Sequence, residues 1–531
     1  MPKVLVSDPI AKEGIDILRK HFDVDVKTGM EKSQLIEIIG EYDALAVRSE
    51  TKVTADVLEA AKKLKIIGRA GVGVDNIDVP VATQKGIIVV NSPAGNTIAA
   101  AELTMAMMLS MSRNIPKGHE MLRAGEWKAA RKALIGVELY GKTLGVFGLG
   151  KIGSEVAKRS KSFEMTVIGC DPFVSEDYAK RLGIELVSFE ELLKRSDYIT
   201  LHVPATKDTK GSINAEQIAM MKDGVRIVNV ARGGIVDEEA LAKAVESGKV
   251  AGIAIDVYSQ EPPPPENPLL KLDHAVTTPH LGASTEEAQI NVAVDVSEQI
   301  VDVLNGKPAR SAVNMPALGA EAMAAVSPYL TLGERIGAML TQLAEGPVEG
   351  VEISYCGEVS ALETGPIGRA VLTGLFQPIL TEQVNLVNAP VIAESRGVRV
   401  TESKTKDCED YTSLLSVKAK VGRNCLLISG TLFGKKDIRI VQIEGHSVDI
   451  VPSGAMIVTT HVDKPGVIGR VGTLLGNHGV NIGGMHVGRE GIGKHALMVL
   501  NVDNPVSEDL LKEIQRMDGI ESAKQVQFGQ I

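Results

Sequence analysis

The 531-residue chain has little of several features that mark particular protein classes. Aromatic residues make up only 3% of it, and no basic run is interleaved with aromatics. Together with a formal net charge of −10, this composition argues against a nucleic-acid-binding surface. The four cysteines have neither zinc-site spacing nor the density of a disulfide scaffold, so we expect reduced thiols and no metal site.

Long apolar runs are also missing. The most apolar helical segment, Ile98 to Ser112, carries Glu102 and is too short to cross a bilayer. The first ten residues, "MPKVLVSDPI", begin directly as a strand and lack the features of a signal peptide. We therefore expect a cytoplasmic protein that does not contact a membrane.

Strands and helices alternate over most of the first 300 residues. The length predicts about three or four domains. The expected elements of the first run are strands Val4–Val6, Ala44–Val47, Lys65–Gly68 and Ile87–Val90, with helices Lys12–His21 and Asp56–Ala61. The second run has strands Thr143–Phe147, Thr166–Cys170, Tyr198–Val203, Val225–Val230, Gly252–Asp256 and Ala275–Thr278. This order predicts an α/β protein with two doubly wound, Rossmann-like parallel sheets.

The pattern changes in the last third of the chain. A helical pattern over Glu286–Leu304 stops at Asn305-Gly306, and the segment Asn314–Pro328 is typical of a linker. An α+β region follows, with a helix to about Leu343. After a turn at Val451–Gly454, the order β-α-β-β-α-β predicts a ferredoxin-like module.

A glycine motif follows the first strand of the second run. Gly148-x-Gly150-x-x-Gly153 lies between an apolar strand and a helix, the context that a dinucleotide-binding turn requires. Asp171 closes the next strand, where a carboxylate accepts hydrogen bonds from the adenosine ribose hydroxyls. No basic residue in Pro172-Phe173 offsets its charge, so NAD is favoured over NADP.

Polar side chains also gather at the carboxyl ends of later strands. Arg232 follows one strand, Asp256 ends the next with Glu261 beyond it, and His280 follows the last. Each alone is compatible with an ordinary surface or loop residue. Because the carboxyl edge of an open parallel sheet is where ligands bind, their joint arrival beside a dinucleotide motif indicates an active site.

Hydride chemistry suggests a role for each of these groups. A secondary alcohol that loses a hydride must also lose its hydroxyl proton, and His280 suits that transfer. A carboxylate beside the imidazole, for which Glu261 is the candidate, fixes its tautomer. Arg232 suits a substrate carboxylate because its guanidinium binds in a bidentate manner.

Several stretches resemble the NAD-dependent D-2-hydroxyacid dehydrogenase family. They are "GRAGVGVDNID", "NSPAGNTIAAAELTMAMML", "KTLGVFGLGKIG", "VNVARGGIVDEEAL", "DVYSQEP" and "TPHLGASTEEAQ". Within the family the chain is similar to long-form members that oxidise 3-phospho-D-glycerate with NAD, the first step of L-serine biosynthesis. The resemblance implies a discontinuous substrate domain (1–97 plus 285–318), an NAD domain (98–284), an intervening domain (319–452) and an ACT domain (453–531).

The resemblance also implies sets of site residues. The catalytic set is Arg232, Glu261 and His280. The cofactor contacts are Gly148, Gly150, Lys151, Ile152, Gly153, Asp171, Val203, Val230, Ala231, Arg232, Asp256, His280, Gly282 and Ala283. The substrate contacts are Arg48, Ser49, Arg69, Gly71 and Asn96. Arg131 and Lys132 either reach the active site of a second subunit, in a homodimer or homotetramer, or form an ordinary basic surface.

The last two modules imply regulation. Asp463 and Asn481 match positions at which ACT domains of the family bind L-serine, whereas His461 departs from the aromatic residue of some long-form members. Serine feedback and a purely oligomeric role therefore both stay open. In the intervening domain, Lys435, Lys436 and Arg439 fit a solvated face better than an anion site.

Three functions remain to be compared. The first is an oxidoreductase acting on 3-phospho-D-glycerate. The second is a reductase of another 2-oxo acid, such as 2-oxoglutarate, hydroxypyruvate or glyoxylate. The third is an NAD-sensing binding protein, because corepressors with this fold keep the same arginine, glutamate and histidine.

Overall fold

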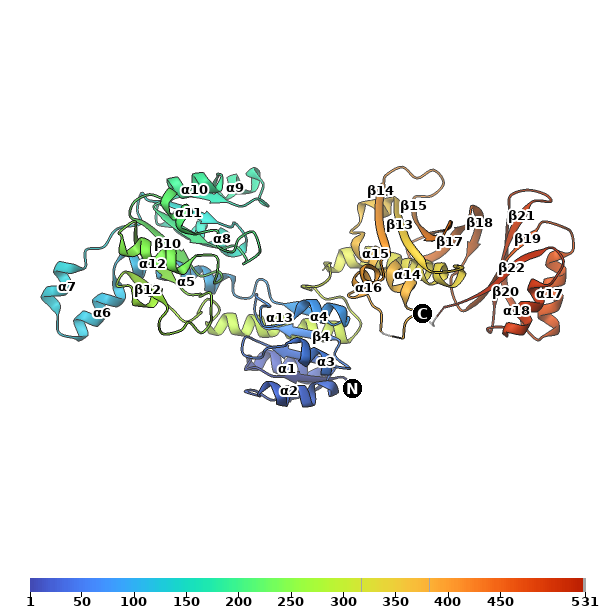
Figure 1. Ribbon diagram of the computed structural model, residues 1–531, viewed down its shortest axis with the longest axis horizontal. Coiled ribbons are helices and arrows are strands. Elements are labelled where there is room, and N and C mark those ends of the chain that lie inside the picture. Colours follow the sequence, from blue (N-terminus) through green and yellow to red (C-terminus); the bar gives the residue numbers. More distant parts are fainter. Residues whose placement is uncertain (317, 382, 529–531) are drawn as a thin grey trace.

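The computed structural model describes residues 1–316, 318–381 and 383–528. The molecule is elongated, with two parallel sheets in one half and two further sheets in the other (Figure 1). None of the described helices combines the length and the apolar character that a bilayer crossing requires. The predicted α/β fold class is confirmed in all its parts.

The first sheet is parallel, with the order β2-β1-β3-β4-β5. Its strands are β1 (Lys3–Val6), β2 (Asp23–Val26), β3 (Ala44–Val47), β4 (Ile66–Arg69) and β5 (Ile88–Asn91). The connecting helices are α1 (Lys12–His21), α2 (Lys32–Ile38), α3 (Ala55–Ala60) and α4 (Val79–Gln84). The strand order reverses between β1 and β3, so their following loops diverge and leave a crevice at the carboxyl edge.

The second sheet is also parallel, with the order β12-β11-β10-β9-β6-β7-β8. Its strands are β6 (Thr143–Phe147), β7 (Thr166–Cys170), β8 (Glu185–Leu186), β9 (Tyr198–Leu201), β10 (Val225–Asn229), β11 (Val250–Ile255) and β12 (Ala275–Thr277). Its helices include α5 (Thr97–Ser112), α8 (Lys151–Ser162), α9 (Glu176–Leu182), α10 (Phe189–Arg195), α11 (Ala215–Met220) and α12 (Glu238–Glu246). The reversal between β6 and β9 places the glycine motif at the switch point.

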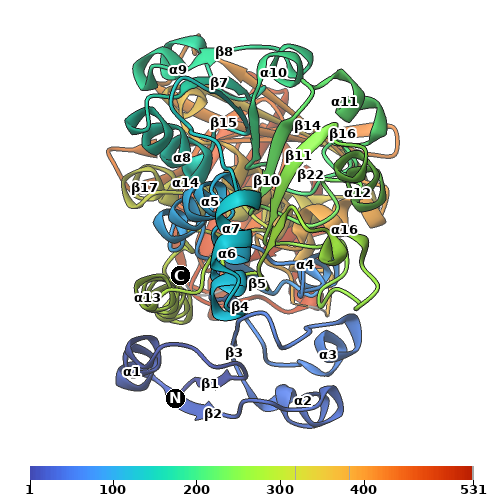
Figure 2. The ribbon, with the colours of Figure 1, turned by 90° about the vertical axis from the view of Figure 1, so that its left-hand side faces the viewer.

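Helix α13 (Glu286–Leu304) carries the chain back to the first sheet, where it packs on α1 and β4. Two glycines allow this close approach. A methyl group at Gly14 would lie 2.7 Å from the carbonyl oxygen of Ala293, and one at Gly68 would lie 2.5 Å from Val296 Cγ1. Figure 2 shows α13 beside the first sheet, although nearly 200 residues of sequence separate it from β5.

The third sheet is mixed, with the order β14-β13-β15-β16-β17-β18. Its strands are β13 (Val348–Gly357), β14 (Arg399–Thr405), β15 (Ser413–Val421), β16 (Asn424–Phe433), β17 (Asp437–Ile443) and β18 (His446–Ile450), with helices α14 (Ala320–Leu343), α15 (Gly365–Phe376) and α16 (Ala389–Ser395). The prediction of a linker over Asn314–Pro328 is wrong from residue 320 onward. The alanine-rich stretch has high helix propensity and forms the start of α14, which packs on α15.

The fourth sheet is antiparallel, with the order β20-β21-β19-β22. It contains β19 (Ala455–Val462), α17 (Val467–Asn477), β20 (Ile482–Arg489), β21 (His495–Val502), α18 (Glu508–Gln515) and β22 (Ile520–Gln527). The β-α-β-β-α-β prediction is therefore confirmed. The face away from its helices shares one apolar core with α14, and Gln342 exchanges two hydrogen bonds with the backbone of Gln527.

Candidate active site

The glycine motif forms a tight turn between β6 and α8. Gly148 has a φ of 96°, a left-handed conformation that favours glycine. A methyl group at Gly153 would lie 2.0 Å from the carbonyl oxygen of Gly148, so only glycine permits this packing. A methyl group at Gly150 would meet nothing within 4 Å, which leaves room for a ligand against this backbone. The turn and the N-terminus of α8 therefore fit a dinucleotide pyrophosphate.

Asp171 lies directly after β7 and beside this turn. Its two carboxylate oxygens accept hydrogen bonds from the backbone N–H groups of Leu149, at 2.8 Å, and Phe173, at 2.9 Å. These bonds fix the carboxylate next to the turn and leave lone pairs for ribose hydroxyls. The other predicted cofactor residues of this region begin α8 or follow β9 and β10: Lys151, Ile152, Val203, Val230 and Ala231.

His280 and Glu261 lie side by side. Nδ1 of His280 is 2.7 Å from Oε2 of Glu261, and the other carboxylate oxygen accepts a hydrogen bond from the backbone N–H of Tyr258. Burial raises the pKa of Glu261, but the hydrogen bond and charge of His280 outweigh it, so the pKa lies below its ordinary value. Because Nδ1 is engaged, Nε2 is the ring nitrogen left for a substrate.

Asp256 supports the loop that carries His280. Its buried carboxylate accepts hydrogen bonds from the Thr278 hydroxyl, at 2.6 Å, and from the backbone N–H groups of Leu281 and Gly282. The backbone of His280 itself adopts a φ of 54°, which is rare for a residue with a side chain. The predicted cofactor residues Asp256, Gly282 and Ala283 are thus part of one braced turn.

Arg232 reaches from the second sheet to the first. Its Nε lies 3.7 Å from Oδ2 of Asp75, and a methyl group at Gly73 would come within 2.5 Å of its guanidinium. The following residue, Gly233, touches the Tyr258 backbone so closely that no side chain would fit. The positive charge of Arg232 also acts on Glu261, which places the three predicted catalytic side chains in one electrostatic environment.

Arg69 is a partly buried cation that forms no ion pair with any described residue. Among the described residues its side chain makes no hydrogen bond or ion pair, and its Nε is buried without a partner. Burial lowers its pKa to about 10; the charges of Arg232 and Arg48 act in the same direction, and those of Asp75 and Asp8 only partly oppose them. Its guanidinium lies across Gly71, where a methyl group would come within 1.6 Å of it.

The remaining predicted substrate residues lie at the same edge of the first sheet. Arg48 and Ser49 follow β3, and Asn96 precedes α5 with its Oδ1 buried and unpartnered in the described structure. Sequence reasoning missed Asp8, whose buried carboxylate accepts hydrogen bonds from the backbone N–H groups of Arg48 and Thr51. The only signal for Asp8 is a carboxylate two residues after a buried strand.

The predicted regulatory residues lie on the fourth sheet. Asp463 is 3.5 Å from the guanidinium of Arg489, and Asn481 donates to Asp503 at 2.9 Å. His461 is buried, with an unpartnered Nδ1 in the described part of the chain. On the third sheet, Lys435 and Lys436 are exposed, whereas Arg439 pairs with Asp449 at 3.2 Å.

Comparison with known proteins identifies the family. The NAD-binding domain of D-isomer-specific 2-hydroxyacid dehydrogenases matches residues 105–282, the D-3-phosphoglycerate dehydrogenase intervening domain matches 325–444, and the ACT domain matches 455–519. D-3-phosphoglycerate dehydrogenase from Archaeoglobus fulgidus is 49% identical over 529 residues, which cover 99% of this chain and 100% of that one. The chain belongs to the D-3-phosphoglycerate dehydrogenase family. The Bacillus subtilis relative is 43% identical over 525 residues and 99% of both chains.

Solved structures resemble the first two sheets of this family member. The TT0316 protein from Thermus thermophilus matches with a TM-score of 0.55 and 36% identity, over 59% of this chain and 99% of that one. D-lactate dehydrogenase from Aquifex aeolicus, complexed with NAD and lactic acid, matches with a TM-score of 0.53 and 29% identity, over 59% and 100%. The predicted family and NAD as cofactor are thereby confirmed.

The His280–Glu261 pair generates the first prediction. We expect Glu261→Gln to lower kcat by roughly two to four orders of magnitude, because an amide cannot stabilise an imidazolium by charge. NADH binding, measured by fluorescence titration, should stay within a factor of two of wild type, about the scatter of small surface effects. Glu266→Gln, an exposed glutamate in the same loop, is the matched control. Near-normal kcat in Glu261→Gln would remove the pair from the mechanism.

Proposed function

We propose that this protein oxidises the C2 hydroxyl of 3-phospho-D-glycerate with NAD and forms 3-phosphohydroxypyruvate, the first step of L-serine biosynthesis. The observation that carries this proposal is the unpartnered, partly buried guanidinium of Arg69, on which the charges of Arg232 and Arg48 act. Three mutually repelling cations favour a ligand with negative charge at both ends, such as a phosphorylated carboxylate. The full-length relatives support the same substrate.

The second sheet holds the cofactor in this proposal. Gly148, Gly150 and the N-terminus of α8 bind the pyrophosphate, and Asp171 binds the ribose hydroxyls. We assign residues 98–284 to this NAD domain and residues 1–97 with 285–318 to the substrate domain. When bound there, NAD accepts the hydride that leaves C2 of the substrate.

His280 acts as the general base in this proposal. Its Nε2 accepts the proton of the C2 hydroxyl while the hydride leaves with its electron pair, so the alcohol becomes a carbonyl. Glu261 orients the ring through Nδ1 and stabilises the imidazolium that results. Asp256 holds the loop in place through its three hydrogen bonds. In the reverse reaction, the same imidazolium returns the proton to the carbonyl oxygen.

The three arginines bind opposite ends of the substrate. Arg232, nearest to the His280–Glu261 pair, binds the carboxylate and polarises the carbonyl that forms. Arg48 and Arg69 bind the phosphate end. Ser49, Gly71 and Asn96, which lie at the same edge, complete the contacts through short side chains and backbone N–H groups.

The activity test is a steady-state NADH absorbance assay. We expect oxidation of 3-phospho-D-glycerate, with product removal to draw the reaction forward, at a higher kcat/KM than for hydroxypyruvate, glyoxylate or 2-oxoglutarate in the reductive direction. A preference for one of these unphosphorylated acids would identify a different 2-oxo acid reductase. NADH-dependent capture of a partner protein without turnover would identify the binding-protein alternative.

Arg69 also has a stability consequence. Its pKa in the folded protein, about 10, lies below the ordinary 12.5, so the charged form of Arg69 lowers the free energy of unfolding. This destabilisation is fully present below pH 10 and disappears as the pH rises through 12.5. We therefore expect Arg69→Met to raise the free energy of unfolding by about 1–3 kcal/mol in phosphate-free buffer and to raise KM roughly tenfold or more.

Calorimetry with and without added phosphate measures this effect. Phosphate should raise the melting temperature of wild type more than that of Arg69→Met, because the anion compensates the buried charge. Arg423→Met, at an exposed turn, is the control. A destabilised Arg69→Met with an unchanged response to phosphate would contradict an anion site at Arg69.

An arm on the second sheet supports a homodimer. Helices α6 (Ile115–Arg123) and α7 (Trp127–Ala133) stand away from the rest of the chain and bury none of their residues (Figure 1). They expose Ile115, Leu122 and Trp127, and the flanking Ile135 is 84% exposed. We propose that a second copy covers this apolar arm and that Arg131 and Lys132 reach the partner's active site.

Light scattering and subunit mixing test the arm. Wild type should have at least twice the monomer mass, and Trp127→Asp should dissociate it. A mixture of His280→Ala and Arg131→Ala/Lys132→Ala subunits should exceed the summed activity of the two, because one hybrid site keeps every group. A monomeric wild type, or purely additive activity, would refute the shared site.

The ACT module supports a regulatory proposal. We propose that L-serine binds near Asp463 and Asn481, between paired ACT domains, and inhibits oxidation. Repeating the activity assay with added L-serine tests this.

The four free thiols and the NAD-dependent metabolic activity support a cytoplasmic location.

A further inference from the structure

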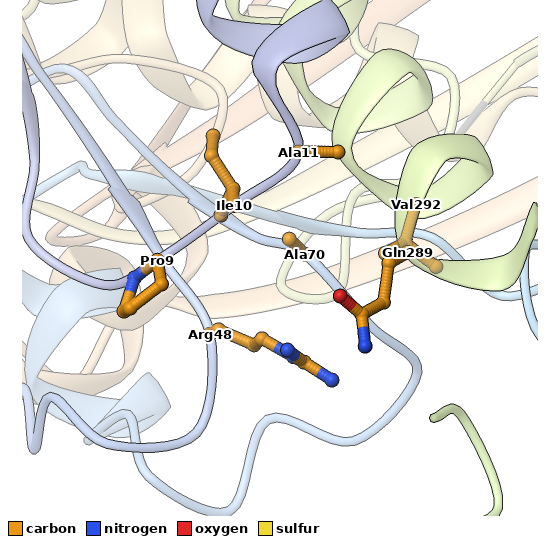
Figure 3. A pocket seen from close by; sticks show the side chains of 7 residues that line it. All are labelled: Pro9, Ile10, Ala11, Arg48, Ala70, Gln289 and Val292. Carbon is orange, nitrogen blue, oxygen red and sulfur yellow. The ribbon is translucent and has the colours of Figure 1, made fainter. Parts of the chain in front are cut away.

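A small pocket lies at the carboxyl edge of the first sheet, at the switch point between β1 and β3 (Figure 3). It is lined by the entry to α1, by the ends of β3 and β4, and by α13: Pro9, Ile10, Ala11, Arg48, Ala70, Gln289 and Val292. Only two of these side chains are polar. Figure 3 shows the guanidinium of Arg48 and the carboxamide of Gln289 extending into the same space in front of Ala70.

The backbone positions of both polar residues, Arg48 and Gln289, are fixed by their surroundings. The backbone N–H of Arg48 donates to the carboxylate of Asp8 at 2.6 Å, and the carbonyl oxygen of Arg48 accepts a hydrogen bond from Asn76 at 2.9 Å. Gln289 lies in the first turns of α13, between Ala288 and Val292, which are both buried. The return of α13 to the first sheet therefore determines where Gln289 meets Arg48.

The chemistry of the pocket selects an anion. Neither Arg48 nor Gln289 makes a side-chain hydrogen bond to any described residue, and no carboxylate is among the lining residues. Asp8, the nearest buried carboxylate in sequence, is occupied by backbone and Thr51 donors. Nitrogen donors from two elements, with Arg69 immediately before Ala70, fit the several acceptor oxygens of a phosphate.

We propose that Gln289 is a specificity-determining residue for the phosphate end of the substrate. Its amide N–H donates to one phosphate oxygen while Arg48 binds another. This inference rests on the proposed function, and it adds a residue to the phosphate contacts. A neutral amide supplies a donor without adding a fourth charge to three arginines that already repel one another. A glutamate of the same length would instead repel the phosphate.

The test compares substrates with and without phosphate. We expect Gln289→Ala to raise KM for 3-phospho-D-glycerate about tenfold with a smaller change in kcat, since one hydrogen bond to a charged group is lost. Gln289→Glu should raise KM by roughly a hundredfold, because repulsion is added to that loss. NADH-dependent reduction of hydroxypyruvate, which lacks the phosphate, should change by less than about twofold in both variants, within ordinary surface effects.

Inhibition by inorganic phosphate gives a second measurement that does not depend on turnover of the phosphorylated substrate. Measured against hydroxypyruvate reduction, the inhibition constant should rise in the order wild type, Gln289→Ala, Gln289→Glu. Glu287→Gln, on the exposed side of α13, should leave it unchanged.

The outcomes separate the two hypotheses. If wild type fails to oxidise 3-phospho-D-glycerate, the proposed function falls before any variant is made. If wild type is active and Gln289→Ala leaves KM and phosphate inhibition unchanged, the role of Gln289 is refuted. Equal losses for both substrates would likewise overturn it, because they would show a structural effect on α13.

Discussion

The packing of α13 against α1 and β4 is the interaction on which the catalytic half depends. Helix α13 shares one face of the first sheet with α1, and Gly14 and Gly68 make the approach close enough. The same segment of chain leaves the second sheet through the His280 loop. One packing contact therefore sets the distance between the histidine of one sheet and the arginines of the other.

The active site concentrates positive charge where the fold offers little to neutralise it. Nε of Arg69 is buried without a partner in the described structure, and Asp75, which lies 3.7 Å from Arg232, is exposed to solvent. A site that must compensate its own charges internally would bind an anion weakly, because the anion would first have to displace those partners. Leaving the guanidinium of Arg69 unpaired lowers the stability of the folded protein and raises its affinity for an anion. Such an exchange of stability for binding is common at functional sites.

The sequence predicts the parts of the site that follow local rules. Strands buried on both faces, such as the ALAV run of β3, are evident as continuous apolar segments, and polar residues after them fall at the ligand-binding edge. Arg232, Glu261 and His280 belong to this class. Gln289 does not, because its meeting with Arg48 depends on how α13 returns to the first sheet, whereas Asp8 meets Arg48 through the pairing of β1 with β3. Likewise β15 and β16 escape prediction, since β15 buries alternate residues and contains lysines, and β16 begins with the exposed Asn424 and Cys425.

The catalytic half and the half with the third and fourth sheets make few contacts with each other, whereas the third and fourth sheets pack closely together. The third and fourth sheets share a continuous apolar core through α14. Between the halves, by contrast, the described residues form two hydrogen bonds, from Asn385 to the carbonyl oxygen of Gly86 and from Asn388 to that of Gln84. Gln84 ends α4, and Gly86 lies between α4 and β5, the strand that leads to Asn96. Any influence of a ligand proposed for the fourth sheet on the substrate edge would therefore pass through this small polar contact, the chain segment before α14, or a second subunit.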